Sequence, residues 1–183
     1  YEDAAHAFGA SYSDGSKVGS CKYSDMTVFS FHPVKSIATG EGGIITTNSE
    51  LIYKQLKRLR NHGLEKNKDN FKLKQNSLTD NLVNPWYYEM QELGYNYRIS
   101  DIQCALGLSQ LKKIDKFIKK RKELAKKYDL AFSNLKNCVP AQKDMRDLSS
   151  NHLYILQINF KKLGKTRANL MNELKKVEIM TQV

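Results

Sequence analysis

The stretch Ser24–Gly43, SDMTVFSFHPVKSIATGEGG, contains the residues that decide how this chain folds. It includes Thr27–Phe31, where β-branched and aromatic residues alternate with small ones, a pattern typical of a short strand. Lys35 follows shortly after this strand, and the glycines of Gly40–Gly43 permit a sharp turn and a close approach of backbone to ligand. Because α/β proteins place their sites at strand ends, Lys35 is a candidate for a chemical role.

A lysine used in chemistry must lose its proton near neutral pH, and burial together with nearby positive charge lowers the pKa of such an amino group. Lys35 could then form a Schiff base with an aldehyde. The alternative is a surface lysine in a flexible turn, which composition alone favours. Asp3 changes this balance, because Tyr1–Asp3 is interpreted as the end of a strand followed by small residues. Alone, Asp3 is more typical of a helix cap, but an acid at a strand end also suits the ring nitrogen of pyridoxal phosphate.

Around this stretch the pattern predicts further elements. Gly43–Thr47 is expected to be a second strand, and Ser49–Asn61 an amphipathic helix capped by Asn48 or Ser49 and ended by Gly63. Residues 65–93 are polar and irregular, a connection of a length that is often functional or mobile. A long helix is expected from Ser100, with Gln103 completing a capping box, to about Leu135, with a possible bend.

After Pro140 the character of the chain changes. His152–Ile158 is expected to be a strand, Thr166–Lys176 a helix and Glu178–Val183 another strand. This β-α-β order predicts a second, smaller domain that begins near residue 136, after a first domain of residues 1–135. The abrupt start and end suggest a piece of a longer chain.

Composition narrows the function classes. The 183 residues carry a formal net charge of +11 with 40% hydrophobic residues, enough for a packed core. The positive charge permits nucleic-acid binding, but the lysines of Lys112–Lys127 alternate with apolar residues at helical spacing and are interpreted as a solvated helix face. No nucleic-acid-binding motif accompanies them, and a basic surface could equally attract anionic small molecules.

Membrane, secretory and metal-binding classes are disfavoured in turn. No window of about 18 apolar residues exists, and no secretory pattern opens the chain. The three cysteines, Cys21, Cys104 and Cys138, are odd in number and widely spaced, which argues against a disulfide framework or a zinc site. We therefore expect a cytoplasmic protein with no metal.

Four motifs in order carry a family resemblance: Glu2–Ala10 (EDAAHAFGA), Ser24–Gly43, Leu59–Gly63 (LRNHG) and Leu93–Leu111 (LGYNYRISDIQCALGLSQL). They resemble the DegT/DnrJ sugar-nucleotide aminotransferases over nearly the whole chain. The segments SFHPVK and SSNHLY most resemble the pseudaminic-acid branch, the UDP-4-amino-4,6-dideoxy-N-acetyl-β-L-altrosamine transaminases. The resemblance implies an α/β fold: part of an aspartate-aminotransferase-type large domain and the start of a smaller C-terminal α/β domain.

The resemblance also implies a cofactor, pyridoxal 5'-phosphate, and roles for particular residues. Lys35 would be the Schiff-base lysine and proton shuttle, and Asp3 would hold the pyridine nitrogen. His6 would lie beside the phenolic oxygen of the ring, and Ser30 would donate to the phosphate. Asn96, supported by Arg98, would reach the cofactor phosphate of a neighbouring subunit, which implies a homodimer with shared active sites. Three residues are candidates for substrate contact: His32, His152 and Trp86.

Several of these candidates have alternatives in the fold. Taken alone, Ser30 could be a small strand residue and Asn96 a turn former. His32 could brace the Lys35 turn, His152 could make a structural hydrogen bond in the small domain, and Trp86 with Tyr87 and Tyr88 could be a surface insertion. His62 is expected to be a helix-end residue, and Glu41 a residue that bonds within its own loop.

By the same resemblance, the reaction would move an amino group, from L-glutamate, to the C4 ketone of a UDP-linked 4-keto-6-deoxy-N-acetyl hexose. An alternative is a different keto-sugar, such as a C3 ketone or a dTDP sugar; another is an inactive basic fragment that binds nucleic acid or a partner protein. The sequence departs from the family pattern in lacking the upstream phosphate loop and the VHYxP motif. Relatives with His in place of the lysine perform dehydration, and Lys35 argues against that branch.

Overall fold

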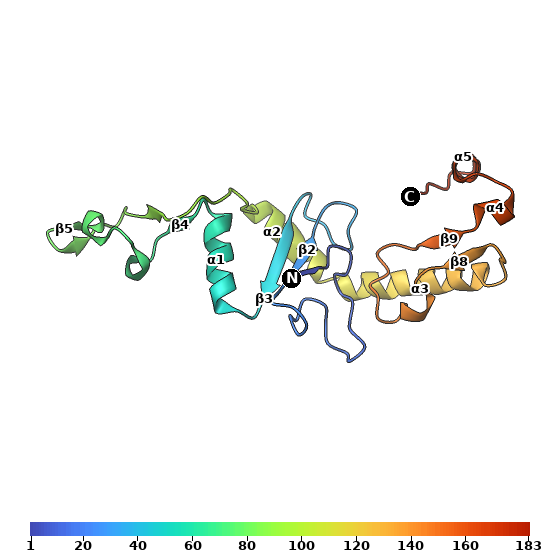
Figure 1. Ribbon diagram of the computed structural model, residues 1–183, viewed down its shortest axis with the longest axis horizontal. Coiled ribbons are helices and arrows are strands. Elements are labelled where there is room, and N and C mark those ends of the chain that lie inside the picture. Colours follow the sequence, from blue (N-terminus) through green and yellow to red (C-terminus); the bar gives the residue numbers. More distant parts are fainter.

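The computed structural model describes residues 1–183, which form an elongated molecule with a small sheet near its middle (Figure 1). The three strands of this sheet lie in the order β1-β2-β3: β1 (Glu2–Asp3), β2 (Met26–Ser30) and β3 (Gly43–Thr47). β1 runs parallel to β2, with Asp3 beside Val28, and β3 runs antiparallel to β2. Because β1 and β2 are parallel, their carboxyl ends meet at one edge, where Asp3 and Ser30 lie. The strands expected on both sides of the Lys35 turn are thus confirmed.

A small apolar core fixes the region around Lys35. Its four buried members are Ala4, Phe29, Phe31 and Ile37. The ring of Phe8 packs edge-on against those of Phe29 and Phe31, with centroids 5.0 and 5.5 Å away. Burying an aromatic side chain of this size contributes about 1.5–3 kcal/mol. Phe31 and Ile37 lie on either side of Lys35 in the sequence, so their burial anchors both ends of the turn that carries it.

Helix α1 (Glu50–Arg60) begins as the sequence predicts, because the Ser49 hydroxyl accepts a hydrogen bond from the Ile52 backbone N–H. Its end differs slightly from the expectation. The last helical residue is Arg60, and both His62 and Gly63 adopt left-handed backbone conformations beyond it. The Gly63 N–H donates to the Arg58 carbonyl at 2.9 Å and completes the helix end.

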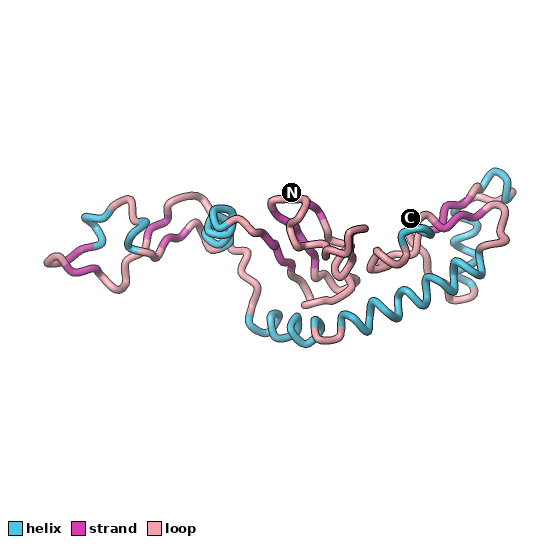
Figure 2. The backbone as a smooth tube through the Cα atoms, turned by 90° about the horizontal axis from the view of Figure 1, so that it is seen from below, coloured by secondary structure: helices cyan, strands magenta, loops and turns pink.

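The expected long helix is present as two helices, α2 (Asp101–Leu111) and α3 (Ile114–Phe132), which lie end to end along the molecule (Figure 2). Ser100 and Gln103 form the predicted capping box, and the bend falls at Lys112–Lys113. The apolar residues of α2 are exposed, Ile102 at 83% and Leu108 at 62%, whereas Ile114 and Phe117 of α3 pack against the core. Only α3 therefore contributes to the core under the sheet. No helix of the chain has the length and apolar character needed to cross a membrane.

Residues 64–93, which we call the arm, extend away from the sheet (Figure 1). The arm contains short paired strands and two 3-10 turns: β4 (Leu64–Glu65), η1 (Lys68–Asn70), η2 (Lys74–Ser77), β5 (Leu78–Thr79), β6 (Leu82–Val83) and β7 (Glu89–Met90). The buried Glu89 carboxylate organises it by accepting from the backbone N–H groups of Lys72 and Leu73 and from the Tyr87 hydroxyl. Burial opposes the ionisation of Glu89, but a hydrogen bond from the Gln91 side-chain amide at 2.9 Å, together with these three, outweighs it and holds the pKa of Glu89 below the ordinary value.

The C-terminal segment corrects part of the expected order. Its elements are β8 (Cys138–Pro140), η3 (Lys143–Met145), β9 (Leu156–Ile158), α4 (Phe160–Leu163) and α5 (Arg167–Lys176). β8 and β9 pair antiparallel, and β9 covers only the last part of the expected strand. The strand expected at Glu178–Val183 was wrong: no strand lies beside this segment to accept or donate ladder hydrogen bonds, and Met180 is 74% exposed. The β-α-β order is therefore absent, and the boundary near residue 136 stays a prediction.

Candidate active site

The turn after β2 holds Lys35 in a defined backbone conformation. The Lys35 N–H donates to the His32 carbonyl at 2.9 Å. Phe31 closes the turn in both directions, because its N–H donates to the Gly42 carbonyl at 2.8 Å and its carbonyl accepts from the Thr39 N–H at 3.0 Å. The Lys35 side chain is half-buried at the carboxyl end of the strand. The hydrogen bonds of the turn thus fix the backbone position from which the Lys35 side chain extends.

The second half of the turn is fixed by α2. Gly42 has φ +156°, and a Cβ at this position would collide with the Thr39 hydroxyl. That hydroxyl and the Gln103 side-chain amide each donate to the Glu41 carbonyl at 2.8 Å. Because Gln103 also belongs to the capping box of α2, the helix start and the lysine turn are held by the same side chain. The prediction that glycine shapes this turn is confirmed at Gly42, where the Thr39 hydroxyl leaves no room for a Cβ.

Lys35 and Asp3 have no ionic partner in the chain. The Lys35 amino group makes no ion pair, and the Asp3 carboxylate accepts only from the Ala5 N–H, at 3.1 Å. The Ser30 hydroxyl accepts from the His32 N–H at 3.3 Å. An amine, a carboxylate and a hydroxyl therefore lie around the edge where β1 and β2 end, with the acid and base uncompensated. Such an arrangement is available for a ligand that carries an aldehyde, a basic ring nitrogen and an anionic group.

His6 and His152 come together from distant parts of the sequence. Their ring centroids lie 4.7 Å apart with an interplanar angle of 53°. The Nδ1 atom of His152 is buried and has no hydrogen-bond partner. Burial and the neighbouring positive charges of His6, Arg121 and Lys35 lower the pKa of His152 to about 4. A neutral imidazole from the C-terminal segment thus lies beside the Lys35 turn.

His32, which precedes Lys35 in the same turn, is exposed. Its Nε2 atom lies 3.7 Å from a carboxylate oxygen of Glu41, and its Nδ1 accepts from the Val34 N–H at 3.4 Å. These contacts brace the turn, as one of the sequence alternatives expected. A substrate contact by His32 stays a prediction.

Asn96 and Trp86 do not join this group of residues. The backbone of Asn96 forms an isolated antiparallel β-bridge with Asn61. Its exposed side-chain oxygen accepts a hydrogen bond from the Arg98 guanidinium at 3.0 Å. Trp86 is 71% exposed on the arm. The predicted contacts of Asn96 with a neighbouring subunit and of Trp86 with substrate therefore stay predictions.

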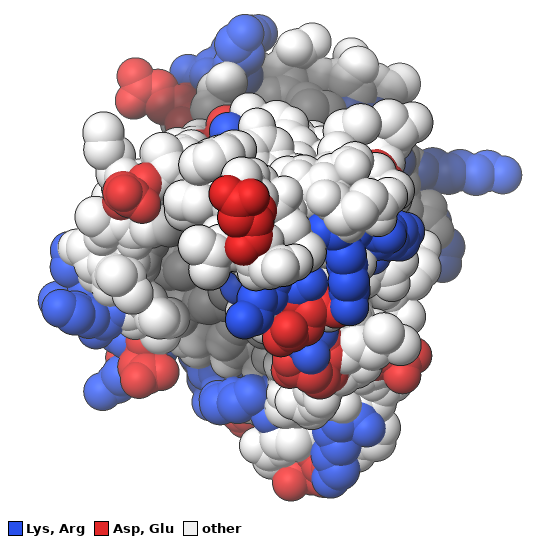
Figure 3. All heavy atoms as spheres, turned by 90° about the vertical axis from the view of Figure 1, so that its left-hand side faces the viewer, with Lys and Arg blue, Asp and Glu red and all other residues white.

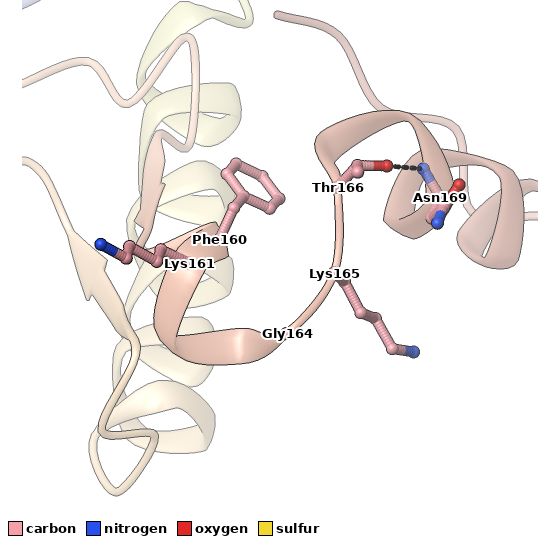
Figure 4. Close-up of a pocket in the computed structure, with 6 residues that line it drawn as sticks. All are labelled: Phe160, Lys161, Gly164, Lys165, Thr166 and Asn169. Atoms are coloured by element: carbon pink, nitrogen blue, oxygen red, sulfur yellow. Dashed lines mark hydrogen bonds between the residues drawn. The ribbon is translucent and has the colours of Figure 1, made fainter.

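A separate hollow lies in the C-terminal segment. It has a volume of about 470 Å³ at the junction of α4 and α5, where Thr166 caps α5 by accepting from the Asn169 N–H (Figure 4). One of its lining residues is apolar, Phe160, and two are lysines. No carboxylate lines it, and none of the residues predicted for the site lies there.

Comparison with known proteins adds independent evidence. The DegT/DnrJ/EryC1/StrS aminotransferase family matches residues 1–183. A UDP-4-amino-4,6-dideoxy-N-acetyl-β-L-altrosamine transaminase of Campylobacter jejuni is 42% identical over 155 residues, which are 84% of this chain and 36% of that protein. The chain belongs to the DegT/DnrJ/EryC1/StrS aminotransferase family.

Two solved structures described as an aminotransferase and a putative sugar aminotransferase show the same fold. Helicobacter pylori PseC, an aminotransferase of pseudaminic acid biosynthesis, superposes with a TM-score of 0.83 at 34% identity, covering 99% of this chain and 43% of PseC. The putative sugar aminotransferase Spr1654 of Streptococcus pneumoniae, in its pyridoxal-phosphate form, gives a TM-score of 0.78 at 30% identity, covering 99% and 42%. The fold class expected from the motifs is confirmed. The chain spans less than half the length of the curated relatives that it matches.

The sequence interpretation missed residues that hold this family site together. Ser150, 1% exposed, donates from its hydroxyl to the His6 carbonyl at 3.1 Å. The Arg121 guanidinium donates to the His152 carbonyl at 3.1 Å. The SSNHLY segment signalled a motif, but its contact with the EDAAHA segment depends on how the chain comes back after α3 and could not be found from spacing.

Proposed function

We propose that this chain supplies the lysine-bearing part of the active site of a pyridoxal-phosphate-dependent sugar-nucleotide aminotransferase. The observation that carries the proposal is the half-buried Lys35, whose amino group has no ionic partner and which lies in the turn that leaves the strand edge carrying Asp3 and Ser30. Family membership over residues 1–183 supports it. When bound, the cofactor supplies an electron sink that stabilises negative charge on the amino-donor carbon.

Each residue of the chain has a distinct task in this proposal. Lys35 anchors the cofactor aldehyde and, once released, moves a proton at the donor carbon. Asp3 would hold the ring nitrogen and keep it protonated, since a carboxylate beside a basic nitrogen favours its charged form. Ser30 would donate its hydroxyl to the phosphate, and His6 would lie beside the phenolic oxygen. The absence of a Lys35–Asp3 ion pair leaves both groups free for these tasks.

The substrate that we propose is a UDP-linked 4-keto-6-deoxy-N-acetyl hexose, with L-glutamate as amino donor. Support comes from the similarity to the Campylobacter transaminase and to PseC. His32, His152 and Trp86 are the candidate substrate contacts, and a net charge of +11 favours the approach of an anionic nucleotide sugar. A panel of keto-sugar nucleotides with product analysis separates this substrate from a C3 ketone or a dTDP sugar.

A homodimer with shared sites completes the proposal, with Asn96 reaching the cofactor phosphate of the second copy. Asn96 is exposed, and the hydrogen bond from Arg98 orients its side-chain amide at the surface.

The alternative of nucleic-acid binding has less support. On the face shown in Figure 3, Lys and Arg are interspersed with Asp and Glu rather than gathered in a single-sign patch.

The test is reduction of the cofactor-loaded chain with borohydride, followed by peptide mass analysis. We expect pyridoxyl label on the peptide that contains Lys35, together with a near-visible absorbance band that Lys35→Ala removes. Lys54→Ala is the matched control, because Lys54 is an exposed lysine of α1 that pairs only with Glu50 at 3.3 Å. Label spread over many lysines, with none enriched at Lys35, would contradict the proposal.

A further inference from the structure

The contact between the His6 turn and the C-terminal segment is built from several interactions. The buried Ser150 hydroxyl fixes the His6 carbonyl, and the ring of His152 lies against the ring of His6 with centroids 4.7 Å apart. Aromatic pairs at this separation contribute beyond their buried area. Ser150 and His152, two residues of one segment, thus hold the backbone and the side chain of His6 respectively.

His152 is itself held in place by Asn151 and Arg121. Asn151 is buried and adopts a left-handed conformation with φ +50°, and its side-chain amide donates to the carbonyls of Arg146 and Ser149 at 2.9 and 3.0 Å. The Arg121 guanidinium donates to the His152 carbonyl. A left-handed non-glycine residue persists only when its surroundings fix it, and such residues cluster at functional sites. The His152 ring is therefore presented to His6 by a rigid support.

The charged groups that face His152 are cationic. They are Lys35 from the turn after β2, Arg121 from α3 and His6 when protonated. No carboxylate accepts from either ring nitrogen of His152, and its buried Nδ1 has no partner. A proton on this ring would be repelled by all three neighbours. The ring is thus suited to act as an uncharged aromatic surface rather than as an acid or base.

We propose that His152 is a positioning residue, which uses its uncharged ring to hold the imidazole of His6 in one orientation at the cofactor edge. Docking of residues 149–152 against the His6 turn then sets the geometry of a site whose lysine comes from a different part of the chain. Only the predicted effect on cofactor binding rests on the proposed function, because the His6–His152 contact exists without any ligand.

The first test observes the histidines of the full chain by NMR without cofactor. The chain contains four histidines, so their ring resonances can be assigned with single variants, and His62→Asn removes one distant ring while preserving a left-handed backbone. We expect the His152 resonances to stay constant from pH 7 to about pH 5. We also expect the His6 ring to lose its ring-current shift in His152→Ala and to regain it in His152→Phe.

The second test measures pyridoxal phosphate affinity. His152→Ala is expected to weaken binding about two- to tenfold, the equivalent of one aromatic contact, and His152→Phe to restore it. His6 resonances that are the same in wild type and His152→Ala, or a failure of His152→Phe to restore either readout although both variants fold, would overturn the inference. If the cofactor does not attach at Lys35 while the NMR results hold, the proposed function fails and the positioning role stands.

Discussion

The Arg146–Asp129 pair gives the sharpest prediction about what holds the C-terminal segment in place. The two side chains are 4% and 11% exposed, and the guanidinium donates to both carboxylate oxygens at 3.0 and 3.1 Å. The Tyr154 hydroxyl adds a third hydrogen bond at 3.0 Å. Burial would raise the pKa of Asp129, but the hydrogen bonds from Arg146 and Tyr154 and the charge of Arg146 hold it below its ordinary value.

Arg146→Ala would leave the Asp129 carboxylate buried without a cation. Breaking such a pair costs about 3–5 kcal/mol, because the remaining charge keeps its desolvation penalty and loses its partner. With a urea dependence of about 2 kcal/mol/M, the unfolding midpoint should fall by about 1.5–2.5 M. The same variant disturbs the Arg146 side-chain contact with Asn151, at 3.3 Å, and so should loosen the support of His152.

The assay is urea unfolding followed by circular dichroism, with a double variant as the decisive comparison. Arg146→Met combined with Asp129→Leu removes both charges at similar volume and should cost less than about 1 kcal/mol. Lys54→Ala is the exposed control, since its partner Glu50 is 71% exposed, and should cost less than about 0.5 kcal/mol. A double variant as unstable as Arg146→Ala would refute the reasoning, because the loss could not then come from an uncompensated charge.

Three further predictions concern the helix start, the lysine turn and pH. Ser100→Ala removes the capping box of α2 and should cost about 1 kcal/mol by urea unfolding, whereas an unchanged midpoint would show that the cap is dispensable. Gly42→Ala should weaken cofactor binding, measured by absorbance titration, because its Cβ meets the Thr39 hydroxyl and displaces the turn; unaltered binding would contradict that role. His152 has a folded pKa of about 4 against an ordinary 6.5, so the unfolded chain binds the proton first and stability falls as pH drops from about 6.5 to 4. The loss should be about 1 kcal/mol after solvent screening of the half-buried ring, and His152→Phe should abolish it; an equal slope in that variant would assign the effect to other groups.

Much of the candidate site followed from local sequence. The alternation in β2, the capping box at Ser100 and the glycine turn after Lys35 depend on neighbouring residues, and the structure confirms each of them. Propensity failed at Glu178–Val183, where apolar β-formers predicted a strand. A strand needs a partner with free backbone groups, and no other strand lies beside this segment.

The sequence by itself determined the family, the strands on both sides of the Lys35 turn and the place of Asp3 at the end of a strand. Only the tertiary structure decided that His152 would lie against His6, that Ser150 would fix the His6 backbone and that Arg146 would pair with Asp129. These contacts join residues separated by long stretches of chain, so they depend on the path of α3 and the packing of the segment after it. The spacing of residues in the sequence does not predict that path, because the free energy of each contact arises from burial that exists only in the folded chain.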